Sequence, residues 1–361
     1  MEKNTIYNTI FKVNHADGSG SCFYLKKYNL FVTNYHVVEG FRKVAIQNSD
    51  KDSFFANVIL VNPDMDIALL STDEDFSALP DIALSEISET VIGQKINVAG
   101  YPFGMPFTVT EGTVSAPKQL MNNSYYIQTD AAVNPGNSGG PMFNDNNELI
   151  AITVSKLTNA DNMGFGIPVA SLKKILDKIE EIDRAAFNVQ CSSCDGFIAQ
   201  EEEYCPSCGN KLPENIFKER GLTKLAEFCE KAIEAMGINP ILARVGYEVW
   251  KFHKGSSEIR MFVYDRSYLF TTSPLNALPK KDVEPVLEYL LKNEIKPYQF
   301  GVSDNQIYIS YRVHISDIFS DYSEEIQKNF TSIAFKADEL DNFLHDTYGC
   351  EFSEYSKKDA I

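Results

Sequence analysis

Short apolar runs separated by turn-forming residues fill the first part of the chain, from about residue 5 to residue 168. Typical runs are IFKV, CFYL, LFVT, NVILV, KINVAG and ELIAITV, and Gly, Pro, Asn and Asp stand between them. Many short strands at this spacing are typical of a β-sandwich or β-barrel. The pattern therefore predicts an all-β domain in this region.

The hydrophobic period changes over residues 168–187, PVASLKKILDKIEEIDRAAF. Pro168 stands at the start, where a helix tolerates proline best. The apolar residues that follow share one helical stripe: Val169, Leu172, Ile175, Leu176 and Ile179. This spacing predicts a helix that closes the β domain.

A third pattern begins near residue 216, after a short segment that carries cysteines. The stretch LTKLAEFCEKAIEAMG predicts an amphipathic helix that ends at Gly237. After it we expect three strands, at about 245–252, 258–264 and 267–272. A helix after Pro279, a strand at 306–315 and a last helix at about 322–346 should follow. This order predicts an α+β domain, followed by a disordered tail over residues 351–361.

Length and charge narrow the class of protein. The chain has 361 residues, too many for one ordinary core, so we expect several domains. Its formal net charge of -17, from 33 basic and 50 acidic residues, makes nucleic acid an unfavourable partner. The sequence shows neither a signal-peptide core nor an apolar run of membrane-spanning length, so we expect a cytoplasmic protein that binds no membrane.

One serine lies in a glycine-rich stretch, VNPGNSGGPMF, and is a candidate nucleophile, Ser138. A serine attacks a carbonyl only if a histidine takes its proton and a carboxylate orients that histidine. His36 ends the strand-like run LFVTNYHVVEG and is a better base than His15, which stands in the loop-like NHADGSG. Asp66 directly precedes the apolar run IALL and is the preferred carboxylate, with Asp64 as the alternative.

The chain order separates two classes of hydrolase. GNSGG also fits G-x-S-x-G, but α/β-hydrolases run serine, acid, histidine and place a helix after the nucleophile. Here the order is His36, Asp66, Ser138, and the strand-like ELIAITV follows the serine. We therefore reject the α/β-hydrolase interpretation. The alternative to a catalytic Ser138 is a tight Gly-Ser turn in a binding protein or in an inactive protease.

Several ordered blocks between Gly18 and Ser171 resemble the trypsin-like serine proteases of the HtrA/Deg branch. These blocks are GSGSCFYL, VTNYHVV, DMDIALL, GYPFG, TVTEGTVSA, IQTDAAVNPGNSGGPMFN, LIAI and GFGIP. The resemblance implies a chymotrypsin-like double barrel of six strands each. It also implies that Ser138 is the nucleophile, His36 the general base and then acid, and Asp66 the group that holds the imidazole tautomer.

The same resemblance assigns the groups around the nucleophile. The backbone N–H groups of Gly136 and Ser138 would form the oxyanion hole. Ala132, six residues before the nucleophile, would lie at the base of the specificity pocket, with walls near 153–155 and 164–166, so cleavage after apolar residues is expected. Asn137 replaces the aspartate that pairs with a new N-terminus in the digestive enzymes, so zymogen cleavage is not expected. No PDZ pattern follows the barrel, and the oligomeric state stays open.

Four of the seven cysteines form two matched pairs, C-x2-C-x10-C-x2-C: Cys191, Cys194, Cys205 and Cys208. Four thiolates at this spacing can surround one structural Zn2+ and leave no open position for catalysis. The pattern predicts a small zinc ribbon with one ion per chain. Redox-active pairs or disulfides are the alternative, and a cytoplasmic setting would disfavour them.

The C-terminal region resembles, through WKFHKGSSEIRMFVYD and IYISYRVHISDIF, the YbjN/type III secretion chaperone-like family. That resemblance implies protein binding and a possible regulatory partner. We thus expect a protease domain over residues 1–187, a zinc ribbon over 188–213, a protein-binding domain over 214–350 and the tail. The hypothesis is a bacterial-type serine endopeptidase acting on proteins or peptides, whose C-terminal domain recruits substrate or senses a partner. The rival is a non-catalytic peptide-binding scaffold.

Overall fold

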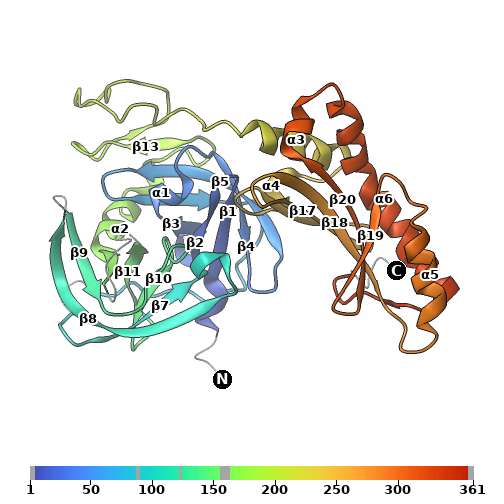
Figure 1. The fold of residues 1–361 in the computed structure, drawn as a ribbon. Helices are drawn as coiled ribbons and strands as arrows, with labels where there is room; N and C mark the ends of the chain where they lie inside the picture. The colour runs from blue at the N-terminus through green and yellow to red at the C-terminus, as the bar shows by residue number, and fades with distance from the viewer. Residues whose placement is uncertain (1–4, 87–89, 122–123, 155–162, 357–361) are drawn as a thin grey trace. The chain divides into compact units, whose positions relative to one another are not determined.

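The computed structural model describes residues 5–86, 90–121, 124–154 and 163–356. The chain divides into two compact units, Met1–Arg220 and Gly221–Ile361. Figure 1 labels the main elements of both units. Among the described residues, no helix has both the length and the apolar character needed to span a bilayer.

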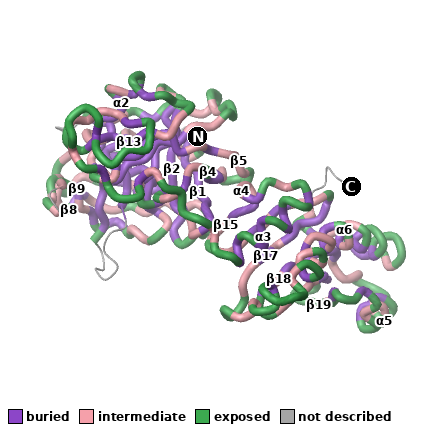
Figure 2. The backbone as a smooth tube through the Cα atoms, turned by 90° about the horizontal axis from the view of Figure 1, so that it is seen from above, coloured by how far each residue is buried: buried purple, intermediate pink, exposed green. Residues whose placement is uncertain are grey.

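The first unit begins with a six-stranded antiparallel barrel. Its strands are β1 (Ile10–His15), β2 (Gly18–Leu25), β3 (Leu30–Thr33), β4 (Lys43–Gln47), β5 (Ser53–Asn62) and β6 (Ile67–Ser71). β1 pairs with β2 and β4, β3 pairs with β2 and β6, and β5 pairs with β4 and β6, so the ring closes. β1 and β2 are buried along most of their length (Figure 2).

A second six-stranded barrel follows in the same unit. Its strands are β7 (Lys95–Gly100), β8 (Thr108–Met121), β9 (Ser124–Thr129), β10 (Pro141–Asn144), β11 (Leu149–Val154) and β12 (Gly164–Pro168). They close in the order β10-β11-β12-β9-β8-β7. The two closed barrels confirm the predicted all-β double barrel.

The helix expected over residues 168–187 is shorter than predicted. α2 spans Val169–Leu176, after Pro168 at its N-cap, and a 3-10 turn follows at Ile179–Glu181. Its apolar stripe is buried in the core shared with the barrels. The helix ends there because Lys178 leaves the helical region of backbone angles (φ -111°, ψ 10°). Within the described ranges, the other short helices of this unit are α1 (Tyr35–Val38) and the 3-10 turns Ile6–Thr9, Lys26–Tyr28 and Pro102–Gly104.

The cysteine segment extends the sheet of the first barrel. β13 (Asn188–Gln190) pairs in parallel with β5, and β14 (Phe197–Ile198) pairs with β13. The segment 188–220 therefore belongs to the same compact unit as the barrels.

The second unit contains a seven-stranded antiparallel sheet and several helices. Its elements are α3 (Lys224–Ala235), α4 (Pro240–Ala243), β15 (Arg244–Gly246), β16 (Val249–Lys254), β17 (Ser257–Tyr264), β18 (Tyr268–Ala277), α5 (Val283–Lys292), β19 (Gln299–Ser303), β20 (Gln306–His314), a 3-10 turn (Ile315–Phe319), α6 (Ser323–Tyr348) and β21 (Glu351–Phe352). The long helix α6 lies against β17, β18 and β20 (Figure 1). A buried ion pair, Glu230 with Arg244 at 2.7 Å, joins α3 to β15.

Several features of the second unit differ from the sequence-based expectation, among them the short helix α4 and the 3-10 turn Ile315–Phe319. β19 and β21 were not predicted, since QFGVS and EF are too short and too polar to stand out. The start of the expected disordered tail is ordered, because β21 pairs with β18 at Phe352 and Asn276. The rest of that tail, residues 357–361, lies outside the described part of the chain.

Candidate active site

His36 and Asp66 lie in hydrogen-bond contact in the first barrel. His36 is in the four-residue helix α1, directly after β3, and Asp66 is the last residue before β6. The Nδ1 atom of His36 lies 2.8 Å from Oδ2 and 3.0 Å from Oδ1 of Asp66. The backbone N–H of His36 also donates to Oδ1 at 3.0 Å. The side chain of Asp66 is 8% exposed and that of His36 is 41% exposed, so a buried carboxylate holds a solvent-accessible imidazole.

The turn between β5 and β6 explains why Asp66 faces His36. Asp66 has a left-handed backbone (φ 54°), which aspartate tolerates better than most residues. The turn is closed by Asn62 Oδ1, which accepts the N–H of Met65 at 2.9 Å. Asn34 Nδ2 donates to the carbonyl of Asp66 at 2.9 Å, a contact that the sequence did not reveal. Asp64, the alternative carboxylate, is exposed.

The loop of Ser138 is fixed to the first barrel by a neighbouring serine. Ser138 lies between β9 and β10 and is buried, and its carbonyl accepts the N–H of Ser21 at 2.8 Å. Ser21 Oγ donates to the carbonyl of Gly136 at 2.7 Å and accepts the N–H of Tyr101 at 3.0 Å. Ser21 thus links β2 to the loop that carries the candidate nucleophile. Sequence reasoning missed it, although it lies within the block GSGSCFYL.

Two glycines bring that loop close to the helix of His36. Gly139 has φ 83°, and a Cβ there would overlap the Ser21 carbonyl and Thr33 Oγ1 and would lie 3.0 Å from the N of Asn34. Thr33 and Asn34 lead directly into α1. A Cβ at Gly20 would lie 2.6 Å from Val37, the neighbour of His36, and 3.2 Å from the carbonyl oxygen of Ser138. The Ser138 loop therefore packs against the residues on both sides of His36.

The backbone of Gly136 differs from that of its neighbours in conformation and in hydrogen bonding. Gly136 has φ 101°, and within the described residues its N–H donates to no protein acceptor. By contrast, the N–H groups of Asn137, Gly139 and Gly140 donate to carbonyls at 2.9, 3.0 and 2.9 Å. Asn137 is buried among them. The free N–H of Gly136 is thus available to a ligand.

The residues of the expected specificity pocket are only partly described. Ala132 is exposed, and its carbonyl accepts Thr110 Oγ1 at 2.9 Å. Val133 Cγ2 would lie 2.5 Å from a Cβ on Gly164, so the valine packs against that glycine. Thr153 is buried in β11, whereas residue 155 of the expected wall lies outside the described ranges.

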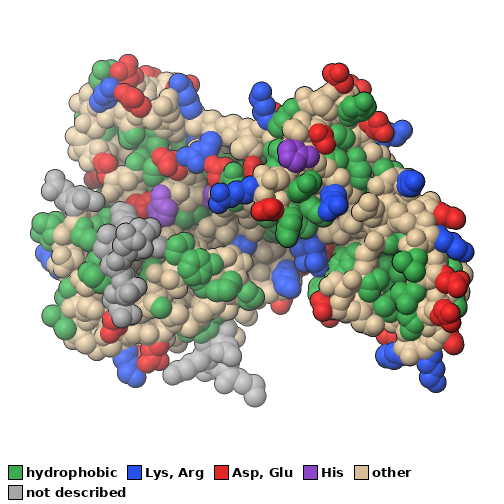
Figure 3. Space-filling model, in the orientation of Figure 1, with side chains coloured by type: hydrophobic (Ala, Val, Ile, Leu, Met, Phe, Trp, Pro, Cys, Tyr) green, Lys and Arg blue, Asp and Glu red, His purple; other side chains and the backbone are tan. Residues whose placement is uncertain are grey.

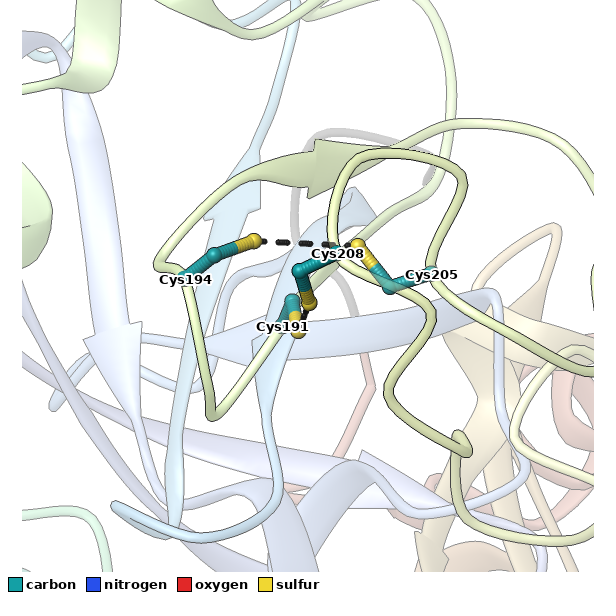
Figure 4. A group of neighbouring side chains, drawn as sticks. All are labelled: Cys191, Cys194, Cys205 and Cys208. Atoms are coloured by element: carbon teal, nitrogen blue, oxygen red, sulfur yellow. Dashed lines mark hydrogen bonds between the residues drawn. The ribbon is translucent and has the colours of Figure 1, made fainter.

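The four cysteines of the two C-x-x-C pairs converge on one point (Figure 4). Their sulfur atoms all lie within 4.8 Å of one another. Cys191 and Cys208 are 3.7 Å apart, as are Cys194 and Cys205, and each of the four is a free thiol in the structure. The pKa of Cys205 is lowered to about 7: burial raises it, but hydrogen bonds from the backbone N–H groups of Cys208 and Ser207 and from the thiols of Cys194 and Cys208 together outweigh that effect.

The two cysteine turns have the same backbone geometry. The N–H of Cys191 donates to the carbonyl of Gly196 at 2.8 Å, and the N–H of Cys205 donates to that of Asn210 at 2.8 Å. In each turn, the residue four positions after the first cysteine is left-handed, Asp195 with φ 57° and Gly209 with φ 75°. This repeated turn points both sulfurs of each pair toward the same centre.

Charged side chains of both signs are interspersed on the face of the molecule drawn in Figure 3. The residues between the cysteine pairs include Glu201, Glu202 and Glu203. These carboxylates would repel a phosphate backbone.

The barrel region is similar in sequence to known proteins. Residues 20–152 match the sequence model of the trypsin-like peptidase domain. The protein named Protease Do-like 1, chloroplastic, from Arabidopsis thaliana is 35% identical over 172 residues, which cover 45% of this chain and 39% of the relative. A probable periplasmic serine endoprotease DegP-like from Hahella chejuensis is 34% identical over 172 residues, 46% of this chain and 36% of the relative. The first unit is therefore similar, over residues 20–152, to trypsin-like peptidase domains.

Solved structures give partial matches. An HtrA-type protease with a tripeptide is 27% identical, with a TM-score of 0.45, over 49% of this chain and 62% of that one. A serine endoprotease from Yersinia pestis is 26% identical, with a TM-score of 0.43, over 49% of this chain and 64% of that one. The chain thus spans well under half the length of the two curated relatives, and the cysteine segment and the second unit lie outside the family match.

The expected cytoplasmic location is wrong. The similar proteins are named as periplasmic or chloroplastic proteases. The absence of a signal-peptide core was too weak a basis for that prediction. Disulfides between the cysteines of the C-x-x-C pairs therefore remain the alternative to a metal site.

Proposed function

We propose that the chain is a serine endopeptidase in which Ser138 attacks the peptide carbonyl, His36 transfers the proton and Asp66 orients His36. The observation that carries the proposal is the 2.8 Å contact between His36 Nδ1 and the buried Asp66 carboxylate, beside the loop of Ser138. The trypsin-like peptidase match over residues 20–152 supports it, since that range includes all three residues.

The chemistry follows from these positions. Asp66 keeps the proton of the imidazole on Nδ1, so that Nε2 can accept the proton of Ser138 Oγ as Oγ bonds to the carbonyl carbon. His36 then gives that proton to the leaving amine, and water hydrolyses the resulting acyl-enzyme by the same route. The N–H groups of Gly136 and Ser138 would stabilise the oxyanion, and each such donor contributes roughly 3 to 4 kcal/mol in similar sites.

The specificity proposal rests on the apolar residues near Ala132. Ala132 and Val133 offer no charge to pair with a basic side chain of the substrate, and an unpaired buried charge is costly. We therefore expect cleavage after apolar residues.

A cleavage profile tests the proposal. An unfolded protein substrate is incubated with the wild-type chain and with Ser138→Ala, and the new peptide termini are sequenced. Wild type should cut after apolar residues, and the variant should not cut. Peptide binding by wild type without any cleavage would instead favour the non-catalytic scaffold.

We also propose that the four cysteines bind one structural Zn2+. Four sulfurs at about 2.3 Å from a zinc ion lie about 3.8 Å apart in a regular tetrahedron. The two 3.7 Å contacts and the 4.8 Å limit on all pairs support this donor set. The ion would crosslink two turns that have little apolar core of their own.

Metal and thiol analysis distinguishes zinc from disulfides. The purified full chain should contain about one zinc per chain and should release the four thiols to a thiol reagent only after chelation. Cys205→Ser should lower the zinc content. Zinc-free protein with these cysteines in disulfides would refute the proposal.

For the second unit, we propose a role in recruiting protein substrates or sensing a partner. One face of β17 and β18 carries exposed aromatic side chains: Tyr264 is 60% exposed and Tyr268 is 40% exposed. The stacked rings of Phe262 and Phe270 lie next to them. This aromatic face supports the proposed role. Exposed aromatic side chains are common at protein interfaces. Tyr264→Ala in the full chain should slow the cleavage of protein substrates and leave that of short peptides unchanged. Equal rates on protein substrates would contradict this role.

A further inference from the structure

The cysteine segment is attached to the first barrel at the turn that holds Asp66. β13 ends at Gln190, directly before Cys191, and it pairs in parallel with the end of β5. β5 ends at Asn62, which opens the turn leading to Asp66. The candidate metal site and the candidate active site thus begin at two adjacent strand ends.

Two buried amide side chains join these strand ends. Asn62 Nδ2 donates to Gln190 Oε1 at 2.7 Å, and the two residues are 1% and 3% exposed. Asn62 also accepts the N–H of Met65, at 2.9 Å, and so closes the turn before Asp66. Gln190 Nε2 donates to the carbonyl of Asp195 at 3.3 Å, inside the first cysteine turn. A continuous series of hydrogen bonds therefore runs from the cysteine turn to the neighbour of Asp66.

The far end of the same segment contacts the chain just after the helix of His36. The backbone N–H of Arg220 donates to the carbonyl of Gly40 at 2.6 Å, and its guanidinium pairs with Asp17 at 2.7 Å. A Cβ on Gly40 would lie 2.9 Å from the Cβ of Arg220, so glycine permits this close approach. The cysteine turns thus lie between two attachments, one at the Asp66 turn and one behind α1.

We propose that metal binding by the four cysteines holds Asp66 in the position that orients His36, with Gln190 as the positioning residue. The inference rests on the proposed function. Bonds from both cysteine turns to one ion would fix residues 191–196 and therefore the carbonyl of Asp195. Without the ion, the contacts in the described residues that join the two turns are weak: the thiol pairs at 3.7 Å and a 3.4 Å hydrogen bond from Asn210 Nδ2 to Ser192 Oγ. The first turn then loosens, Gln190 loses one of its two partners, and Asn62 holds the Asp66 turn less firmly.

The test uses Gln190→Met in the full chain, which removes both hydrogen bonds of Gln190 and keeps a side chain of similar volume. The zinc content should stay near that of wild type. Reaction of Ser138 with a fluorophosphonate should fall about 10- to 100-fold, the size expected for a small misplacement of a catalytic group. Amide hydrogen exchange of residues 62–66 should become faster, and the low-field proton resonance of His36 Nδ1 should shift. Removal of the metal from wild type should change these readouts in the same direction.

Asn188→Ala is the matched control. Asn188 lies on the same strand, is 2% exposed, and donates to the carbonyl of Ile59 at 2.9 Å, away from the Asp66 turn. This variant should speed exchange in β13 but leave residues 62–66 and the His36 resonance as in wild type.

Hydrogen exchange and the resonance do not depend on activity, so the two proposals can fail separately. If both Gln190→Met and the metal-free chain keep wild-type exchange in 62–66 and the wild-type resonance, the coupling is wrong. If both readouts move but the wild-type chain never reacts with the fluorophosphonate, the coupling stands and the proposed function is wrong. Metal removal also keeps the test valid if Gln190→Met fails to fold.

Discussion

Replacing Asp66 with asparagine removes the charge of the proposed triad and keeps the shape of the side chain. The carboxylate accepts two N–H groups of His36, the backbone N–H at 3.0 Å and Nδ1 at 2.8 Å. An asparagine oxygen at the Oδ1 position can still accept the backbone N–H of His36. Its NH2 group then stands at the Oδ2 position, 2.8 Å from Nδ1, where it opposes an Nδ1–H and favours an unprotonated Nδ1. The imidazole proton would move to Nε2, which could no longer accept the proton of Ser138. Because asparagine also tolerates φ near 54°, the turn should keep its conformation.

The expected loss in kcat is about 10⁴-fold, which corresponds to roughly 5 kcal/mol of transition-state stabilisation. The assay is the rate of peptide hydrolysis, with the melting temperature measured alongside to show that the fold is intact. Asp64→Asn is the matched control, since it makes the same change two residues earlier at an exposed position and should leave the rate near that of wild type. The reasoning would be refuted if Asp66→Asn kept more than a tenth of the activity, or if Asp64→Asn lost as much.

Two further predictions concern stability. Gly139→Ala should lower the free energy of unfolding by more than about 3 kcal/mol, because the new Cβ overlaps backbone and side-chain oxygens. Gly93 has a similar φ but no atom within 4 Å of a new Cβ, so Gly93→Ala should lower it by about 1 kcal/mol. Equal losses in urea unfolding would show that the overlap does not matter. Glu230→Gln should destabilise the second unit by about 3 to 5 kcal/mol, since Glu230 accepts two hydrogen bonds from buried Arg244, at 2.7 and 2.8 Å. The control is Glu339→Gln, which breaks an exposed ion pair with Lys336 and should destabilise the unit by under about 1 kcal/mol. Trp250, the one tryptophan of the chain, reports on this unit by fluorescence, and a small loss for Glu230→Gln would contradict the importance of the pair.

The features that could be predicted from the sequence are those set by local patterns. Short apolar runs predicted the strands of both barrels, because strands such as β1, β3 and β11 are buried along their whole length and therefore stand out as apolar runs between turn residues. The spacing of Cys191, Cys194, Cys205 and Cys208 placed four sulfurs together, because each pair sits in one short turn. His36 and Asp66 could be paired because each stands at the end of an apolar run, where a barrel fixes its direction.

The contacts that could not be predicted join distant parts of the chain. β13 is three residues long and pairs in parallel with β5, so no hairpin or periodic pattern marks it. Ser21 donates to a backbone carbonyl of the Ser138 loop, and Asn34 donates to the carbonyl of Asp66. Any small polar residue can make such a bond, so the sequence does not single these two out. The end of α2 was missed because the apolar stripe continues to Ile179, although the backbone leaves the helix before it.

Fluorophosphonate labelling, with the modified peptide mapped by mass spectrometry, tests the central claim most directly. A serine activated by a histidine reacts with this reagent, whereas an ordinary serine in a glycine-rich turn does not. The account predicts one label per chain, located on Ser138, strongly slowed in Asp66→Asn and absent in Ser138→Ala. A label on another residue, or no label on the folded wild-type chain in the presence or absence of zinc, would contradict it.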